Sequence, residues 1–578
     1  MKNTKAFEVV SPVGGLNVMV SPGEITNIQS PDLRNVEFWE KELQGRFGRR
    51  KLTTAGLSGK VVGLDQYYLF SGASYLMAHS PKDVYRYYSS DKSWKYLTPA
   101  YTTGTVAVTN NSADIVGTNT VWSTNVAVGD KFRLGGLNDA DPIWYEVNTV
   151  TDDTHITLTA VYAEATASGQ AYTIRKLYTG GNTDLTVKDI ITDLYVFTNG
   201  INNIQKWDGD TSHLASDLGG SPPKAKFLCG YKDQLILGYT IEDGADCPQR
   251  LRWSAVGNPE SYPSENFMDL VEGADWISGL AILGNYLVVF KERSIYLLYY
   301  VGGYWQFKQE MVVSGIGNIA PFSLGNLGDE ILFLGPDGVY AFNGRNADNI
   351  TDDNIKDIID NLNPTAKFYS YGLIVEEKHQ YWLAVPYGES ETNDKLLVYD
   401  YFLGSWSWHD IPAGVFGYYN LEGDLTIGEL EGTIGDLQGR IGDRFLLANA
   451  PINLIGGYDG YIYKVGEGQV DDGATYTRYW VSKWFNFDAP HRVKTVSRLQ
   501  PFLHNERGGS IDISIGTDFK DSWDLTKTIS LDDATAGEML KPNVDFKLTA
   551  KNFRVKFSAT NYFRLQKFIW YFLEKGFR

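Results

Sequence analysis

The sequence predicts an all-β protein built around a β-propeller of about seven blades, with a small inserted β domain and a C-terminal β-sandwich. Two observations carry this prediction. Short apolar runs bounded by polar turns recur along the chain at roughly the 40–50-residue spacing of propeller blades. The 59 glycines and 14% aromatic residues favour short strands and many turns over helices. A chain of 578 residues exceeds one compact core, so we expect several domains.

The first segment, residues 1–55, is rich in glycine, proline and asparagine in its first half, as in SPVGGLNVMVSPGEI. We expect it to form an extended strap that lies over the body of the protein. The propeller is then expected at 56–100 and 176–472. Its first meander reads VVGLDQYYLFSG, SYLMAHS and DVYRYYSSDKSWKYL, which are strand-length apolar runs separated by turns.

Residues 101–175 interrupt the propeller pattern with a composition rich in Thr, Val, Asn and Gly. The stretch THITLTAV alternates with a period of two, which is typical of a half-buried strand. Exposed loop tips tolerate inserted domains. We therefore expect a small β domain here, inserted into a loop of the propeller.

The clearest blade is Trp276–Phe307, which reads WISGLAILGNYLVVFKERSIYLLYYVGGYWQF. Polar breaks at Gly284-Asn285 and Glu292-Arg293-Ser294, and then a Gly-Gly pair, divide it into four runs of strand length, none long enough to span a membrane. We expect an antiparallel meander whose runs LAIL and YLVVF lie in the core. In TDDNIKDIID (351–360), Thr351 is a candidate N-cap, and three isoleucines share one face, so we expect a helix.

The last segment, 473–578, changes pattern again. SIDISIG and FRVKFSA alternate cleanly between apolar and polar residues, as strands with one buried face do. We expect a terminal β-sandwich or jelly-roll of about 100 residues.

The formal net charge of −18 argues against a protein that grips nucleic acid by neutralising phosphates. It is compatible with a surface past which DNA slides, because like charges do not adhere. The two cysteines, Cys229 and Cys247, fit no metal spacing, and free thiols are favoured over a disulfide. The N-terminus has no apolar region typical of a signal peptide, and we expect no transmembrane segment.

Catalytic motifs are weak. SSDKSW (89–94) is the nearest match to an Asp-box turn of propeller glycosidases, but it lacks the glycine and is not repeated in register. The seven histidines are scattered, and acidic turns such as Asp208–Asp210 and Asp352-Asp353 fit solvated turns better than calcium loops. We therefore expect a non-enzyme and assign no catalytic residue, no cofactor and no metal site. Trp406 and Trp408 share a face that suits either a core or a docking surface.

Four motifs carry a family resemblance. The first is an N-terminal frame of Gly14-Gly15-Leu16-Asn17, Ser21-Pro22, Leu33-Arg34-Asn35-Val36 and Arg46-Phe47-Gly48-Arg49. The second is LRWSAVGNPESYP (251–263), the third an acidic glycine run at 422–443, and the fourth the ending WYFLEKGFR. In this order they resemble the tail nozzle family of short-tailed bacteriophages, also called tail tubular or DNA-stabilising tail proteins. Tyr262 departs from the Trp that is more usual there, and the 101–175 insertion has no counterpart.

The resemblance implies a structural protein of the virion tail, assembled in the host cytoplasm. Such subunits form a ring with copies of themselves, often a hexamer, below a portal and adaptor, and tail fibres or spikes are further candidate neighbours. DNA would be retained by this ring and would pass through its lumen during ejection without specific binding. The alternative is a carbohydrate-active or carbohydrate-binding β-propeller that acts on the host surface.

Overall fold

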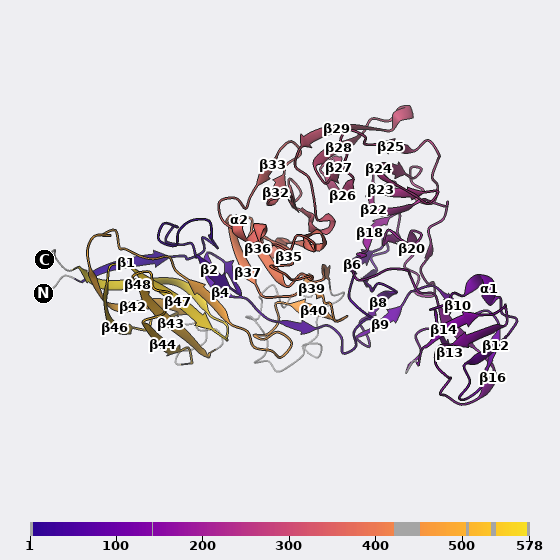
Figure 1. Ribbon diagram of the computed structural model, residues 1–578, viewed down its shortest axis with the longest axis horizontal. Helices are drawn as coiled ribbons and strands as arrows, with labels where there is room; N and C mark the ends of the chain where they lie inside the picture. Colours follow the sequence, from indigo (N-terminus) through magenta and orange to yellow (C-terminus); the bar gives the residue numbers. More distant parts are fainter. Residues whose placement is uncertain (1–3, 141–142, 421–450, 505–507, 533–538, 575–578) are drawn as a thin grey trace.

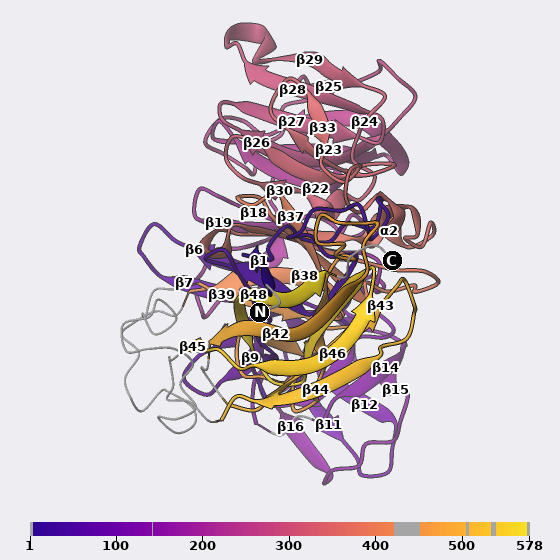
Figure 2. The ribbon, with the colours of Figure 1, turned by 90° about the vertical axis from the view of Figure 1, so that its left-hand side faces the viewer.

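The computed structural model describes residues 4–140, 143–420, 451–504, 508–532 and 539–574 (Figure 1). Within these residues the chain forms a β-propeller of seven four-stranded sheets, a β-sandwich and an inserted β domain. In Figure 1 the sandwich lies at the left, the propeller at the centre, and the insertion at the lower right. Turned by 90°, the third to fifth blades rise above the sandwich and the insertion extends below it (Figure 2).

The first three blades follow one another along the chain. Their strands are β6 (Gly63–Tyr68), β7 (Ser74–His79), β8 (Val84–Tyr88) and β9 (Ser93–Tyr96); β18 (Val187–Ile191), β19 (Leu194–Thr198), β20 (Gln205–Trp207) and β21 (Ser216–Asp217); and β22 (Lys224–Tyr231), β23 (Gln234–Glu242), β24 (Ala245–Trp253) and β25 (Phe267–Asp269).

The next three blades repeat this order. They consist of β26 (Ile277–Leu283), β27 (Tyr286–Lys291), β28 (Ser294–Tyr300) and β29 (Phe307–Ser314); β30 (Gly325–Asn326), β31 (Ile331–Leu334), β32 (Val339–Phe342) and β33 (Ala347–Asn349); and β34 (Tyr371–Val375), β35 (Gln380–Val385), β36 (Lys395–Asp400) and β37 (Ser405–His409). The short 3-10 helices are η1 (Gly303–Trp305), η2 (Pro321–Ser323), η3 (Lys367–Tyr369) and η4 (Glu376–Lys378).

The seventh blade closes the ring with a strand from the other end of the chain. β38 (Val415–Tyr419), β39 (Ile452–Gly456) and β40 (Ile462–Val465) are followed in the sheet by β5 (Arg49–Lys51), which pairs antiparallel with β40. The inner strand β38 packs beside β6 of the first blade. The blades therefore form a closed ring whose last sheet is completed by the N-terminal segment.

The fourth blade shows why its strands read as continuous apolar runs. Leu287 and Val289 of β27 pack toward the third blade, whereas Val288 and Phe290 pack toward the fifth. A strand buried on both faces has no polar alternation. Gly284, with φ of +58°, makes the two-residue turn between β26 and β27, as glycine allows. The meander predicted at Trp276–Phe307 is confirmed for its first three strands, but the fourth run, YWQF, begins in the 3-10 helix η1, and the fourth strand β29 runs from Phe307 to Ser314. LAIL was expected in the core, but Ile282 is 37% exposed, whereas YLVVF is buried apart from Tyr286.

The insertion lies between the outer strand of the first blade and the inner strand of the second. Its strands form an eight-stranded sheet of β10 (Ala100–Tyr101), β11 (Thr105–Val108), β12 (Asp114–Thr118), β13 (Lys131–Leu134), β14 (Tyr145–Val150), β15 (His155–Leu158), β16 (Ala167–Gln170) and β17 (Tyr172–Arg175), with α1 (Trp122–Asn125) beside it. Its own core contains Trp122 and Phe132, so it folds around a centre separate from the propeller.

The sandwich combines both ends of the chain. One sheet contains β1 (Lys5–Val10), β3 (Val36–Trp39), β4 (Glu42–Gly45), β42 (Lys494–His504), β45 (Met539–Leu540), β46 (Val544–Ala550) and β48 (Arg564–Glu574). The other contains β2 (Asp32–Arg34), β41 (Arg478–Val481), β43 (Ser510–Thr517), β44 (Leu525–Ser530) and β47 (Phe553–Ala559).

Two expectations differ from the structure. Residues 1–55 were expected to form an extended strap, but they contain β1 to β5, because extended backbone pairs with the open edges of neighbouring sheets. The helix expected at 351–360 is shorter: α2 spans Lys356–Asp360. Thr351 does not cap it, since its hydroxyl accepts a hydrogen bond from Val339 N–H and donates one to Asn349, which holds 351–355 in turns.

A chain that begins at residue 53 would lack β1 to β5 and would leave the bonding edges of β40 and β48 unpaired. We expect this truncated chain to aggregate or to lose cooperative thermal unfolding, because long open strand edges pair with other chains. A chain that begins at residue 5 is the control. Monomeric behaviour in size-exclusion chromatography and an unchanged melting temperature for the shorter chain would contradict the closure described here.

Candidate functional site

The N-terminal sequence motifs lie at the joint between propeller and sandwich. One hydrophobic core runs through it, shared by Trp406 and Trp408 of the sixth blade, Ile358 of α2, and Trp480 and Phe568 of the sandwich. The sequence left open whether the two tryptophans of β37 serve a core or a docking surface. They are the surface on which the sandwich and the N-terminal segment pack, within one chain.

The Gly14-Gly15-Leu16-Asn17 motif lies directly against β37. Leu16 N–H donates a hydrogen bond of 2.8 Å to the carbonyl of Trp406. Gly15 has φ of +76°, and a Cβ at this position would lie 2.7 Å from the backbone nitrogen of Trp406. Only glycine fits so close a backbone approach.

The Leu33-Arg34-Asn35-Val36 motif makes the next contact along β37. Asn35 N–H donates to the carbonyl of Trp408 at 2.9 Å. The side-chain oxygen of Asn35 accepts hydrogen bonds from Asp410 N–H and from Arg46 Nε, each at 2.9 Å. Asn35 is buried and left-handed, with φ of 55°, a conformation that asparagine tolerates better than most residues. One side chain thus joins blade, sandwich and closing segment.

Two buried arginines of the joint, Arg46 and Arg478, lie against the ring of Tyr476. Arg46 binds the Asp471 carboxylate through two nitrogens, at 3.0 and 2.7 Å, and lies 3.7 Å from the Tyr476 ring centre. Arg478 lies 4.1 Å from the same ring and donates to the backbone carbonyls of Arg46, Gln469 and Thr560. Burial lowers the pKa of Arg478. Buried charges with this many partners hold one geometry, because each loses its compensation if the joint moves.

Gly48, in the Arg46-Phe47-Gly48-Arg49 motif, fixes the entry into β5. A Cβ on Gly48 would lie 1.9 Å from the carbonyl oxygen of Val470. Gly48 N–H donates to the carbonyl of Gly468 at 2.9 Å. The motif therefore contains glycine because two backbone segments touch where the closing strand leaves the joint.

An ionic group lies beside these contacts. Glu37 pairs with Lys378 of η4 at 3.1 Å, with both side chains largely buried. Burial opposes ionisation of Glu37, but Lys378, with a smaller contribution from His409, outweighs it and keeps the pKa of Glu37 below its usual value. Burial, reinforced by the charge of Arg46, lowers the pKa of His409 to about 4. His409 is therefore neutral at pH 7.

The insertion is attached to the first blade by a buried ion pair. Arg175 of β17 lies 3.0 Å from Asp83, and the two side chains are 5% and 1% exposed. The guanidinium of Arg175 also lies over the rings of Tyr96, at 3.9 Å, and Trp144, at 4.5 Å. Asn138 bonds both backbone groups of Tyr96. The insertion is thus docked firmly on the end of the propeller.

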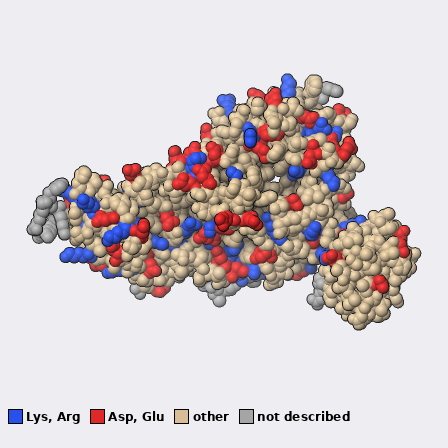
Figure 3. Space-filling view, in the orientation of Figure 1, with Lys and Arg blue, Asp and Glu red and all other residues tan. Residues whose placement is uncertain are grey.

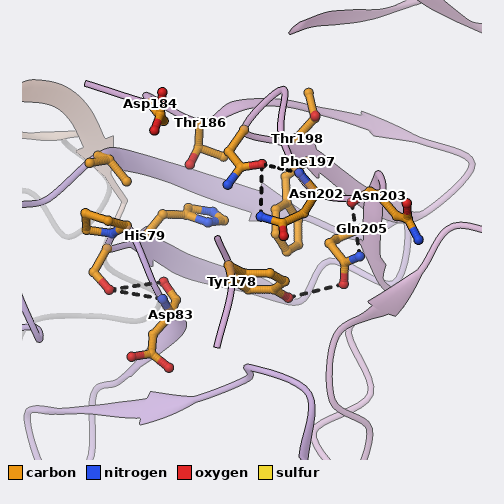
Figure 4. A pocket seen from close by; sticks show the side chains of 14 residues that line it. His79, Asp83, Tyr178, Asp184, Thr186, Phe197, Thr198, Asn202, Asn203 and Gln205 are labelled. Atoms are coloured by element: carbon orange, nitrogen blue, oxygen red, sulfur yellow. Dashed lines mark hydrogen bonds between the residues drawn. The ribbon is translucent and has the colours of Figure 1, made fainter. Parts of the chain in front are cut away.

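A small cavity lies between the first and second blades (Figure 4). Its volume is about 20 Å³, and His79, Asp83, Tyr178 and Gln205 are among its lining residues. His79 Nε2 lies 2.9 Å from the Tyr195 hydroxyl, and Tyr178 O–H donates to Gln205 at 3.2 Å. Burial lowers the pKa of His79 to about 3. A cavity of this size holds a water rather than a substrate.

The LRWSAVGNPESYP motif connects the second and third blades. Ser254 is buried, and its hydroxyl accepts a hydrogen bond from Leu235 N–H at 2.9 Å. Glu260 reaches the second blade, where it binds Lys206 at 2.7 Å and accepts Gly219 N–H at 2.7 Å. The hydrogen bond from Lys206 lowers the pKa of Glu260. This motif therefore also marks a contact between sheets.

The other residues singled out in the sequence lie in turns or in the core. Asp91 of SSDKSW accepts a hydrogen bond from Ser93 and pairs with Lys95 in the hairpin of β8 and β9. His213 binds Asp208 at 2.7 Å in an exposed turn. Cys229 and Cys247 are both free thiols. The acidic glycine run at 422–443 lies outside the described residues.

Within the described residues, no group of three or more His, Cys, Asp or Glu side chains is arranged to hold a metal ion. No helix in that part of the chain is both long and apolar enough to cross a membrane.

Gly48→Ala is expected to lower the free energy of unfolding by about 2–4 kcal/mol, because the added methyl overlaps a backbone carbonyl that cannot move aside alone. Chemical denaturation measures this change. Gly181→Ala is the matched control, since a Cβ there lies 3.6 Å from its nearest neighbour. Equal stability of the two variants would contradict the close approach.

His409 makes stability depend on pH in a defined direction. Its pKa of about 4 in the folded chain lies below the usual value of about 6.5. Between these two pH values His409 is protonated in the unfolded chain and neutral in the folded chain. Stability is therefore full above pH 6.5 and falls as the pH drops toward 4. Between pH 7 and pH 5, the titration of His409 should lower the free energy of unfolding by about 2 kcal/mol.

Urea unfolding of His409→Gln should show a loss between pH 7 and pH 5 that is smaller by that amount than in the unsubstituted protein. His491→Gln is the control, because His491 is exposed. If both variants lose as much stability on acidification as the unsubstituted protein does, His409 is not the titrating group.

Comparison with known proteins assigns no family to this chain. No family model and no curated protein sequence matches the chain. Among solved structures, the computationally designed Ika8 protein is 10% identical, with 72% of this chain and 99% of that chain covered and a TM-score of 0.33. The WD40 domain of Neurospora crassa Pan2 is 8% identical, with 64% and 89% covered and a TM-score of 0.28. The endosialidase of phage phi92 is 11% identical, with 57% and 64% covered and a TM-score of 0.19. Likeness at this level carries no argument about this chain.

Proposed function

We propose that this chain is a structural, non-enzymatic subunit of a bacteriophage tail that assembles with its own copies into a ring or nozzle below a portal and adaptor. The ring retains the genome and conducts DNA during ejection. The observation that carries the proposal is the location of the N-terminal motif frame. Gly15, Asn35, Arg46 and Gly48 belong to three separate motifs, yet they meet in one joint between propeller and sandwich.

This convergence supports the family resemblance in a specific way. A chance match of short glycine-containing motifs would scatter over unrelated turns. Here each of these three motifs contains a residue that a close backbone approach or a shared hydrogen bond requires. We infer that the motifs make the connection between propeller and sandwich rigid. A rigid connection suits a subunit that transmits force between its neighbours better than one that acts on a substrate.

Charge and shape fit the same role. With a net charge of −18, the surface repels the phosphates of a passing genome. In Figure 3, acidic side chains gather near α2, whereas the visible face of the insertion carries few charged side chains. The sandwich and the insertion lie at opposite ends of the elongated molecule (Figure 1), so each end offers a different surface to a neighbour.

Native mass spectrometry of the purified protein, together with copy counting in purified particles, tests the proposal. We expect a closed ring of several identical subunits, six in the form that the resemblance suggests, and the same number in each particle. One or two copies per particle would contradict a ring. A channel wall that electron microscopy of the particle found to be predominantly basic would contradict the role as a DNA conduit.

A further inference from the structure

A groove of about 290 Å³ lies on the outer face of the five-stranded sandwich sheet. Its floor is formed by β47, where Arg554 and Lys556 point outward between the buried residues Phe553, Val555 and Phe557. Its walls are formed by the N-terminal segment on one side and by the loop between β43 and β44 on the other. The lining residues are Pro22, Pro31, Asp32, Val481, Ser482, Trp484, Asp521, Trp523, Arg554 and Lys556.

The N-terminal wall is bonded firmly to the sheet. Trp484 N–H donates to the carbonyl of Pro22 at 2.9 Å. The buried Ser30 hydroxyl lies 2.7 Å from the carbonyls of both Asp32 and Val481. Asp32 itself accepts a hydrogen bond from Tyr479 O–H at 3.0 Å. The groove is therefore a fixed feature of the folded chain and is not a gap between loose loops.

The opposite wall is ordered by a stack of aromatic rings around a guanidinium. Arg554 lies 4.6 Å from the ring centre of Trp484 and 4.4 Å from that of Trp523. Its Nη2 donates to the carbonyls of Lys520 and Asp521, at 2.6 and 2.9 Å. Trp523 is partly exposed, and its indole N–H donates no hydrogen bond to another group within the described residues. Rigid aromatic groups at a groove offer binding surface at a low cost in entropy.

The charges in the groove are balanced but not paired. Among the described residues, no salt bridge within 4.0 Å joins Arg554, Lys556, Asp32 or Asp521 to an oppositely charged side chain, although Asp521 acts electrostatically on Arg554 and Asp32 on Lys556. Lys556 instead lies 4.0 Å from the ring centre of Tyr479. Burial lowers the pKa of Lys556, with Asp32 acting in the opposite direction. The groove thus offers a hydrogen-bond donor, Lys556, and acceptors, Asp32 and Asp521, beside the indole of Trp523.

From this arrangement we propose that the groove binds an uncharged saccharide, one or two hexopyranose units of a glycan chain. Sugar hydroxyls donate hydrogen bonds to carboxylates and accept them from ammonium, guanidinium and indole N–H groups, while the C–H face of the ring packs on an indole. The two carboxylates disfavour phosphate, sulfate or nucleic acid, and the two cations disfavour a cationic ligand. A volume near the lower limit of small-molecule sites, roughly 300 Å³, fits a short segment of such a chain.

This site is independent of the proposed ring, because the residues that form it all belong to one chain. The test uses the full-length protein and saturation-transfer difference NMR with lactose, maltose and cellobiose as probes. A sulfated disaccharide and a single-stranded DNA dodecamer serve as anionic probes. We expect signals from at least one neutral disaccharide and none from the anionic probes.

Trp523→Ala should weaken the binding of that disaccharide at least tenfold. Trp305→Ala is the matched control, because Trp305 is 71% exposed on the fourth blade, far from the groove in sequence. Asp32→Asn and Lys556→Met remove one acceptor and one cation without removing a ring, and each should also weaken binding. They keep the test valid if Trp523→Ala does not fold, which circular dichroism and thermal melting would reveal.

Three outcomes would overturn the inference. The first is the absence of signal from all three neutral disaccharides. The second is binding that Trp523→Ala, Asp32→Asn and Lys556→Met leave unchanged while the proteins remain folded. The third is binding of the sulfated disaccharide or the DNA in preference to the neutral sugars, which would assign the groove to an anionic polymer.

Discussion

The architecture depends on one non-local constraint: the backbone pairing of residues 30–52 with both halves of the protein. This segment completes the seventh blade through β5 and enters both sandwich sheets through β2, β3 and β4. Its contacts span most of the chain, since Ser30 binds a carbonyl 451 residues away and Arg46 binds a carboxylate 425 residues away. Pairing at such separation closes the propeller ring and prevents open strand edges, but it must wait until the C-terminal part of the chain is present.

The joint that this segment forms combines an apolar core with fully bonded buried charges. Trp406, Trp408 and Trp480 supply buried area, which is not directional. Arg46 and Arg478 supply directional contacts to carbonyls and a carboxylate, which fix the angle between propeller and sandwich. The close contacts of Gly15 and Gly48 then exclude side chains from the places where backbones meet. Rigidity at the joint is the property that a subunit needs when its two ends contact different neighbours.

The joint and the saccharide groove are two uses of the same N-terminal segment. Leu16 and Asn35 bond to the sixth blade, whereas Pro22 and Asp32, which lie between them in the sequence, form a wall of the groove. A segment held at both ends can present the residues between them in one position. A ring-forming subunit with a glycan site on its sandwich would both conduct DNA and bind a polysaccharide. Native mass spectrometry tests the ring, and NMR with disaccharides tests the groove.

The sequence by itself determined the all-β class, the blades and their approximate number, because a strand buried on both faces must be apolar throughout and a turn must contain residues that tolerate it. The run YLVVF, which forms β27 and is buried on both faces, shows this directly. It did not reveal that β5 closes the ring, because three residues without an apolar pattern become a strand only when β40 offers an edge. Nor did it decide the role of Trp406 and Trp408 or bring Asp32, Trp523 and Lys556 together. Those outcomes belong to the tertiary structure, since they depend on which surfaces distant segments bury against one another.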